Sequence, residues 1–148
     1  MKNIFYTAFL LVTTIVVVAS CKSTSTLFIK LSDYKGQRLQ YGSQGGITGG
    51  GTTISIIENG QIFSTTTNPE VEYYHGQANA KEAANLIAEA MTLIDKHGEM
   101  TGSGNMTYYL VYNDGITARR ITWAAEAFPP EDVKAFTAKV EQYLRSAK

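Results

Sequence analysis

The sequence predicts an α+β domain in which an antiparallel sheet of about five strands carries two helices packed on one face. Two stretches rich in strand-forming residues contain the dipeptides Asn59-Gly60 and Asp114-Gly115, which are typical of hairpin turns. A segment with apolar residues at helical spacing follows each of these hairpins. The predicted order is therefore strand, hairpin, a candidate further strand, helix, hairpin and helix, written β-ββ-(β)-α-ββ-α.

The first elements lie between residues 27 and 51. The apolar run 27–31 predicts a strand, because it is composed mainly of branched and aromatic residues. Seven glycines then occur from Gly36 to Gly51, including Gly45-Gly46 and Gly49-Gly50-Gly51. Glycine weakens regular structure, so this range predicts a loop.

The range 52–67 predicts a hairpin with a two-residue turn at Asn59-Gly60. This turn pairs Ile57 with Ile62, and the next pair is Ile56 with Phe63. The predicted register places three apolar side chains on one face of the sheet: Ile54, Ile56 and Phe63. Residues 71–74 are the candidate for the further strand.

The range 79–96 predicts a helix. Asn79 is a favourable capping residue, and Glu82 three positions later completes a pattern similar to a capping box. Lys96 and His97 fall in the last turn, where positive charge is favoured, and Gly98 follows as a stop. The predicted buried stripe comprises Ala83, Leu86, Ile87, Ala90 and Ile94, widened by Met91 and Leu93.

The range 106–123 predicts a second hairpin with a two-residue turn at Asp114-Gly115. A three-residue turn that includes Asn113 would shift each pair by one position, and we prefer the shorter turn because it separates the apolar residues better. The predicted faces are Tyr108, Leu110, Ile121 and Trp123 on one side, and Tyr109, Val111, Ala118 and Arg120 on the other. A final helix begins after Pro129-Pro130, with Val133, Phe136, Val140 and Leu144 on its apolar face.

The amino terminus has the pattern of a secretory signal. Lys2 is followed by an apolar run from Ile4 to Ala19, then by small residues and the single cysteine of the chain, Cys21. The run of about 16 residues is shorter than the ~20 that a helix needs to cross a bilayer. The residues after Cys21 are polar at once.

The motif Val18-Ala19-Ser20-Cys21 resembles the lipobox of bacterial lipoproteins. The resemblance implies that residues 1–20 are removed and that Cys21 carries fatty acyl chains such as palmitate. The polar composition after Cys21 predicts a short tether over residues 21–26, and the length of the remaining chain predicts a single domain over residues 27–148. Several acyl chains on Cys21 are enough for stable membrane anchoring. Lys22, in place of an aspartate after the cysteine, implies the outer membrane with the domain facing the periplasm.

Composition excludes several classes of function. The chain has 13 basic and 13 acidic residues, and this zero net charge argues against nucleic-acid binding, which requires a basic patch. One cysteine excludes an internal disulfide framework, and two histidines, His75 and His97, leave little material for a metal site. No Ser-His-Asp arrangement or acid–base pair stands out, so the sequence predicts no catalytic residue and no cofactor.

The glycine-rich range is a candidate binding loop. Its spacing resembles that of a phosphate-binding loop, but Gly51 occupies the position of the essential lysine and a strand follows where a helix is required. We therefore reject nucleotide binding and keep contact with a partner as the hypothesis, against a plain connector as the alternative. The candidate residues are Gly45, Gly46, Thr48, Gly49, Gly50 and Gly51.

Aromatic residues on the strands provide a second candidate surface. Consecutive residues of a strand point to opposite faces, so one tyrosine of each adjacent pair lies away from the helices. We select Tyr73, Tyr109 and Arg120 as candidates for a binding surface on that face. The alternative is that these tyrosines only build the sheet.

The sequence thus predicts a membrane-tethered lipoprotein of the bacterial cell envelope that acts as a non-enzymatic binding or protein-interaction module. The predicted partners are the bilayer, through acylated Cys21, and an envelope protein or a cell-wall component. The alternatives are an envelope hydrolase, its accessory subunit, or an inhibitor that protects the envelope from hydrolases.

Overall fold

The structure, a computed structural model, describes residues 29–47, 49–98 and 100–147. It confirms the predicted α+β class, with six strands where about five were predicted. The strands are β1 (Arg38–Gly45), β2 (Gly50–Ile57), β3 (Gln61–Thr67), β4 (Val71–Gln77), β5 (Met106–Asn113) and β6 (Ala118–Ala124). The helices are α2 (Ala80–Lys96) and α3 (Glu131–Arg145), and a short 3-10 turn, η2 (Leu31–Asp33), precedes β1.

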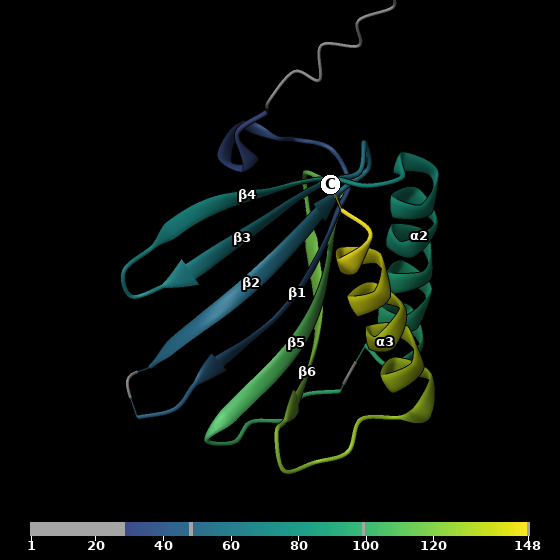
Figure 1. Cartoon of the computed structure of the whole chain (residues 1–148). Helices are drawn as coiled ribbons and strands as arrows, with labels where there is room; N and C mark the ends of the chain where they lie inside the picture. Colours follow the sequence, from purple (N-terminus) through teal and green to yellow (C-terminus); the bar gives the residue numbers. More distant parts are fainter. Residues whose placement is uncertain (1–28, 48, 99, 148) are drawn as a thin grey trace, which may run out of the picture. The chain divides into compact units, whose positions relative to one another are not determined.

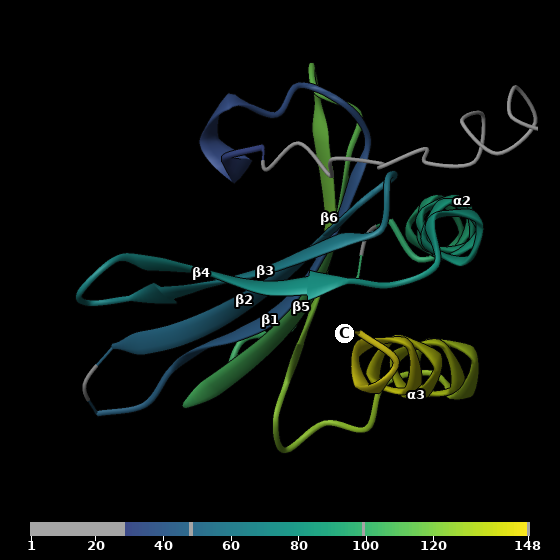
Figure 2. The ribbon, with the colours of Figure 1, turned by 45° about the horizontal axis from the view of Figure 1, so that its top comes forward.

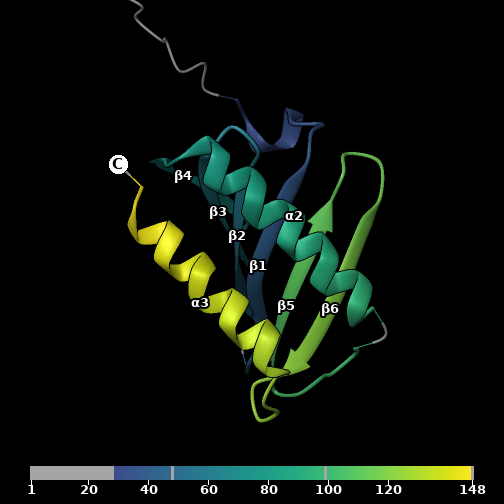
Figure 3. The same ribbon diagram turned by 90° about the vertical axis from the view of Figure 1, so that its right-hand side faces the viewer.

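The six strands form one antiparallel sheet in the order β4-β3-β2-β1-β5-β6 (Figure 1). The first four strands follow one another as a meander. Helix α2 then carries the chain back across the sheet, so that β5 pairs with β1 and not with β4 (Figure 3).

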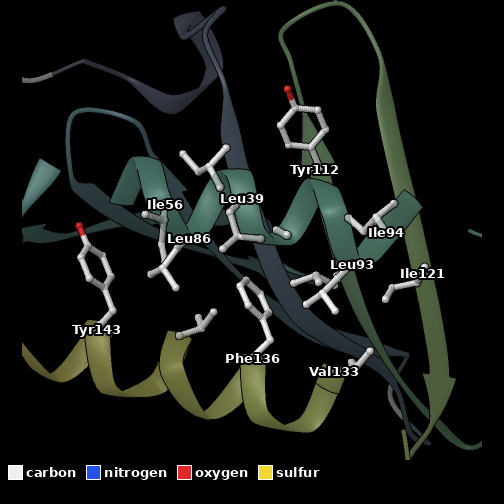
Figure 4. Packing of buried hydrophobic residues seen from close by; sticks show 14 of the residues in the cluster. Leu39, Ile56, Leu86, Leu93, Ile94, Tyr112, Ile121, Val133, Phe136 and Tyr143 are labelled. Carbon is white, nitrogen blue, oxygen red and sulfur yellow. The ribbon is translucent and has the colours of Figure 1, made fainter. Parts of the chain in front are cut away.

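Both helices lie on the same face of the sheet (Figure 2). Their apolar stripes pack onto strands β1, β2, β5 and β6, where Phe136 and Tyr143 of α3 point toward Leu86 of α2 and Ile56 of β2 (Figure 4). Burial of these stripes is the main source of stability for both helices, because helices of this length are marginal alone in water. Among the described residues no α-helix covers the opposite face, which is called the helix-free face below (Figure 2).

The prediction of a strand over residues 27–31 is wrong for the residues that the structure describes. Ile29 and Lys30 belong to no strand, and Leu31 begins η2. Leu31 is buried in a small second cluster with Ile57 and Phe63 on the helix-free face. Its apolar character therefore serves the packing of a turn onto the sheet. Leu27 and Phe28 lie outside the described residues.

The prediction of a loop over residues 36–51 is also wrong for most of that range, because it contains β1 and the start of β2. Gly42 stands directly opposite Tyr109 of β5. A Cβ atom on Gly42 would lie 2.7 Å from the Tyr109 hydroxyl and 2.4 Å from the carbonyl oxygen of Thr52. Glycine inside a strand can mark such a close approach, and here it does not mark a loop.

The first hairpin is confirmed, but its predicted register is wrong by one residue. The observed pairs are Ile56 with Ile62 and Ser55 with Phe63. The turn spans residues 58–60, with Gly60 at a φ of 89° and its N–H bonded to the carbonyl of Ile57. Three-residue hairpin loops commonly end in such a left-handed residue. The slip moves Phe63 to the helix-free face, away from the predicted face of Ile54 and Ile56.

The second hairpin has a four-residue turn, because Asn113 pairs with Ala118. The Asp114 carboxylate organises this turn by accepting hydrogen bonds from the backbone N–H groups of Ile116 and Thr117 and from the Thr117 hydroxyl. The predicted two-residue turn is therefore wrong. A shift by two positions preserves the side of the sheet that each residue occupies, so the predicted faces are confirmed.

The helices and the candidate strand at residues 71–74 are confirmed. The Asn79 side chain caps α2 by accepting from the backbone N–H of Glu82 at 3.1 Å. In α3, Leu144 is only half-buried, whereas Tyr143 is fully buried and was not predicted.

Cys21 and its motif, the tether over residues 21–26, and Thr48 lie outside the described residues. Within the described part of the chain, no helix is both long enough and apolar enough to cross a membrane.

Candidate functional site

Two of the residues predicted for a binding surface, Tyr109 and Arg120, lie together on the helix-free face. Tyr109 is only 7% exposed, since its ring covers Gly42 and its hydroxyl bonds to the Thr53 hydroxyl at 2.5 Å. The Arg120 guanidinium lies over the ring, 4.2 Å from its centre. The aromatic surface of Tyr109 is thus used within the sheet, as in the alternative interpretation, and only Arg120 remains exposed.

The third predicted residue, Tyr73, lies on the other face of the sheet. It pairs with Ser64, whereas its neighbour Tyr74 pairs with Phe63 of the helix-free face and contacts the Phe63 ring at 5.4 Å. Directly paired residues share a face, so Tyr74 takes the position that was predicted for Tyr73. Both tyrosines are exposed, Tyr73 by 53% and Tyr74 by 42%.

The glycines of the candidate loop are mainly structural. Gly45 and Gly50 pair at the end of the β1–β2 ladder, and Gly51 lies within β2. The Gly46 N–H bonds to the carbonyl of Asn105 at 2.7 Å, which ties the turn to the start of β5. The tip presents Ile47, whose side chain is fully exposed.

The two edges of the sheet differ. Along β6, residues 100–102 run beside the strand, and Thr122 exchanges two backbone hydrogen bonds of 3.0 and 2.9 Å with Met100 and Gly102. Along β4, no strand pairs on the outer side within the part of the chain that the structure describes. This edge, β4 with Tyr73 and Tyr74 on its two sides, is called the open edge below (Figure 1).

A hollow of about 280 Å³ lies on the helix-free face between the open edge and η2. Its charged side chains are Arg38, Glu70 and Glu72, and its remaining lining is Leu31, Ser32, Gln40, Thr53 and Thr65. Strands β1 to β4 position Arg38, Gln40, Thr53, Thr65 and Glu72, because alternate residues of adjacent strands point to the same face. The other three come from η2 and from the turn between β3 and β4. We call this feature the Arg38 hollow.

A serine and a histidine meet on the helix-bearing face. His75 Nε2 lies 2.6 Å from the Ser64 hydroxyl, beside an apolar hollow of about 250 Å³ that is lined by Ile54, Ile62, Leu144 and Ala147. The sequence did not indicate this pair, because it depends on the β3–β4 register. Among the described residues no carboxylate bonds to the ring of His75, so the third member of a catalytic triad is not in place.

A charged cluster joins the end of α2 to the start of α3. Asp132 accepts a hydrogen bond from Lys96 at 2.6 Å and lies 3.0 Å from His97 Nε2. The hydrogen bonds from Lys96 and then His97 hold the pKa of Asp132 well below its usual range. The open hollow beside this cluster, about 470 Å³, is lined by the end of α2 and Met100. The cluster thus has a structural explanation.

The pKa values of two tyrosines are raised mainly by burial, which is a structural and not a catalytic cause. Burial raises the pKa of Tyr34 to about 12, with a contribution from Glu58, and it also raises the pKa of Tyr41.

In the described ranges, no group of three or more His, Cys, Asp or Glu side chains is placed to hold a metal ion. Comparison with known protein families and with curated proteins finds no match for this chain.

Proposed function

We propose that this protein is a lipid-anchored lipoprotein of the bacterial cell envelope that binds another protein, without catalysis, by strand addition at the open edge. The observation that carries this proposal is the contrast between the covered edge at β6 and the edge at β4, along which no other described strand pairs. An unpaired edge offers a row of backbone N–H and C=O groups, and extended peptides bind such edges by adding a strand.

The two exposed tyrosines support this role. Tyr73 and Tyr74 are adjacent and point to opposite faces, so their rings flank the position of an added strand on both sides. Tyrosine is enriched in protein interfaces because it combines a large apolar ring with a hydroxyl group.

The charge of the open edge indicates the kind of segment that it binds. Glu70 and Glu72 are exposed, and the range 68–79 contains no Lys or Arg. Proteins commonly protect an edge strand with lysine, and β4 has none. We therefore infer that the partner supplies an extended segment that carries Lys or Arg.

Acylation of Cys21 confines this interaction to the membrane surface. Leu31 comes ten positions after Cys21, and ten extended residues span at most about 36 Å. A partner at the open edge is thus itself a membrane protein or a component close to the bilayer. Replacement of Cys21 by Ser should remove acyl chains and release the domain from the membrane fraction, and a wild-type chain without acyl groups would contradict the anchoring.

Site-specific photo-crosslinking in the producing cell tests the binding proposal. A photoreactive phenylalanine at position 73 should crosslink to one protein, within an extended segment that contains Lys or Arg. The matched control is the same group at position 128, where the natural Phe128 is 96% exposed but distant in sequence from the open edge. Equal crosslinking at both positions, or crosslinking only to a second copy of this chain, would contradict the proposal.

A hydrolase is the second candidate, and the Ser64–His75 contact is the observation that favours it. Turnover of acyl esters with apolar chains, which suit the adjacent hollow, provides the test. Under our proposal the wild-type protein and Ser64→Ala hydrolyse these esters at the same background rate. A rate in the wild type that Ser64→Ala abolishes would establish the hydrolase in place of the binding module.

A further inference from the structure

We propose that the Arg38 hollow binds a small zwitterion of the amino-acid or short-peptide class, with the carboxylate of the ligand at Arg38 and its ammonium group at Glu70 and Glu72. This inference does not rest on strand addition, although the hollow shares Glu70 and Glu72 with the open edge, because its cation, Arg38, lies on β1, three strands away from β4.

Arg38 retains unused capacity for hydrogen bonding. Among the described residues, Arg38 forms one long hydrogen bond, 3.5 Å from Nη1 to the carbonyl of Leu31, and its Nε is buried with no acceptor. A buried donor without an acceptor costs about 1–3 kcal/mol. Because Nε has almost no accessible surface, a ligand in the hollow would reach the guanidinium through its Nη groups. A planar carboxylate suits these groups, because two parallel N–H···O bonds match its geometry.

The two carboxylates of the hollow are also not neutralised. Within the described residues, neither Glu70 nor Glu72 forms an ion pair with Arg38 or with any other cation. Glu72 accepts one bond, 3.4 Å long, from the backbone N–H of Leu31. Opposite charges therefore line the same hollow without meeting each other.

This arrangement selects a ligand that carries both charges. A simple anion at Arg38 would also experience the two carboxylates, and a simple cation at Glu70 and Glu72 would also experience the guanidinium. A zwitterion satisfies both ends at once, and the amide and hydroxyl groups of Gln40, Thr53 and Thr65 add neutral hydrogen-bonding partners between them.

The size of the hollow limits the ligand. About 280 Å³ is below the range of roughly 300–1,000 Å³ that is typical of pockets for drug-sized molecules. The occupant is thus an amino acid or a peptide of two or three residues, and not a folded partner. A free amino acid and a short peptide both carry one ammonium group and one carboxylate group at their ends. The experiment must therefore distinguish ligands by their length.

Isothermal titration of the full-length lipidated protein in detergent tests the assignment. The probes are glycine, diglycine and triglycine, whose two charges are increasingly far apart, with acetate, methylamine and glucose as single-charge and neutral controls. We expect saturable binding of at least one zwitterion and at least ten-fold weaker binding of every control. Equal binding of acetate, methylamine or glucose, or saturable binding of no zwitterion at tens of millimolar, would overturn the proposal.

Two variants on opposite ends of the hollow check the orientation. Arg38→Gln and Glu72→Gln should each weaken the binding of the zwitterion at least ten-fold, with the unfolding midpoint recorded to show that each variant is folded. Arg120→Gln is the matched control, because it removes an exposed guanidinium from the same face outside the hollow and should leave the affinity unchanged. Unchanged affinity in both Arg38→Gln and Glu72→Gln, or an equal loss in Arg120→Gln, would contradict the assignment.

Discussion

Tyr143 near the carboxyl end of the chain should be one of the most important side chains for stability. It is 1% exposed, and its ring is part of the main core (Figure 4). Its hydroxyl donates toward the carbonyl oxygens of Asn79 and Gly60, at 3.2 and 3.4 Å. The residue therefore joins α3 to the start of α2 and to the β2–β3 turn, although chain ends usually contribute little.

The structure allows the contributions of the ring and the hydroxyl to be separated. Tyr143→Phe removes only long hydrogen bonds, and each carbonyl keeps a second donor: the N–H of Ala78 at 3.0 Å for Gly60, and the N–H of Ala83 at 3.0 Å for Asn79. The expected loss in the free energy of unfolding is about 1 kcal/mol. Tyr143→Ala also leaves a cavity the size of an aromatic ring, and the expected loss is about 3–5 kcal/mol.

Equilibrium unfolding in urea, followed by the fluorescence of the single tryptophan, Trp123, measures both losses. The control is Gln142→Ala, an exposed residue of the same helical turn, with an expected change within about 0.5 kcal/mol. A loss below about 1.5 kcal/mol for Tyr143→Ala would mean that the last turns of α3 are not part of the cooperative core. Equal losses for Phe and Ala would refute the separation of ring and hydroxyl.

The same phenol should titrate late. Burial, with a smaller contribution from Glu82, raises the pKa of Tyr143 to about 12, above the usual value of about 10. The folded state therefore favours the neutral phenol. This contribution to stability is complete below pH 10 and is lost as the pH rises through 12. The difference in phenolate absorbance between wild type and Tyr143→Phe should appear near pH 12, and a difference near pH 10 would contradict the burial.

Two further predictions concern acid stability and turn geometry. The depressed pKa of Asp132, caused by Lys96 and His97, means that its contribution is present above about pH 4 and is lost as the pH falls below that value. Asp132→Asn should therefore lower the urea midpoint at pH 6 and flatten its decline between pH 4 and 2; parallel wild-type and variant curves would contradict this. Gly60→Ala should cost at least about 2 kcal/mol in urea unfolding, because the residue has a φ of 89° and its Cβ would lie 2.4 Å from a carbonyl oxygen. Gly49→Ala, at a φ of 63° in open space, is the control with backbone strain alone, and an equal cost for both would remove the role of the close contact.

The parts of the fold that depend on local patterns were predictable. The apolar stripe and the Asn79 cap specify α2 within its own sequence, and the structure shows both. Strand β1 was not predictable in the same way, because its assignment depends on β2 and β5, which pair with it on both sides. From the sequence alone Gly42 predicts a loop, and only the structure shows that the ring of Tyr109 covers it.

The candidate site depended even more on register. A slip of one position moved Phe63 to the helix-free face, and Tyr74 follows it there through direct pairing while Tyr73 does not. The burial of Tyr109 depends on Gly42, Thr53 and Arg120, which lie on three other strands. The sequence of a single strand therefore cannot predict the burial of Tyr109. The Arg38 hollow cannot be predicted from one strand either, because its lining comes from four strands in register.

The central position of β1 has a consequence for the order in which the protein folds. Strands β1 to β4 pair with their neighbours in the chain, whereas the β1–β5 ladder joins residues that are more than 60 positions apart. Closing such a long loop is slow, so we expect β1 to wait for β5 while the amino-terminal meander is already formed. The edge of β1 that later pairs with β5 is an aggregation hazard in that interval. The glycines of β1 are the reason why composition predicts a loop there. They also weaken the pairing of β1 with other chains before β5 pairs with it.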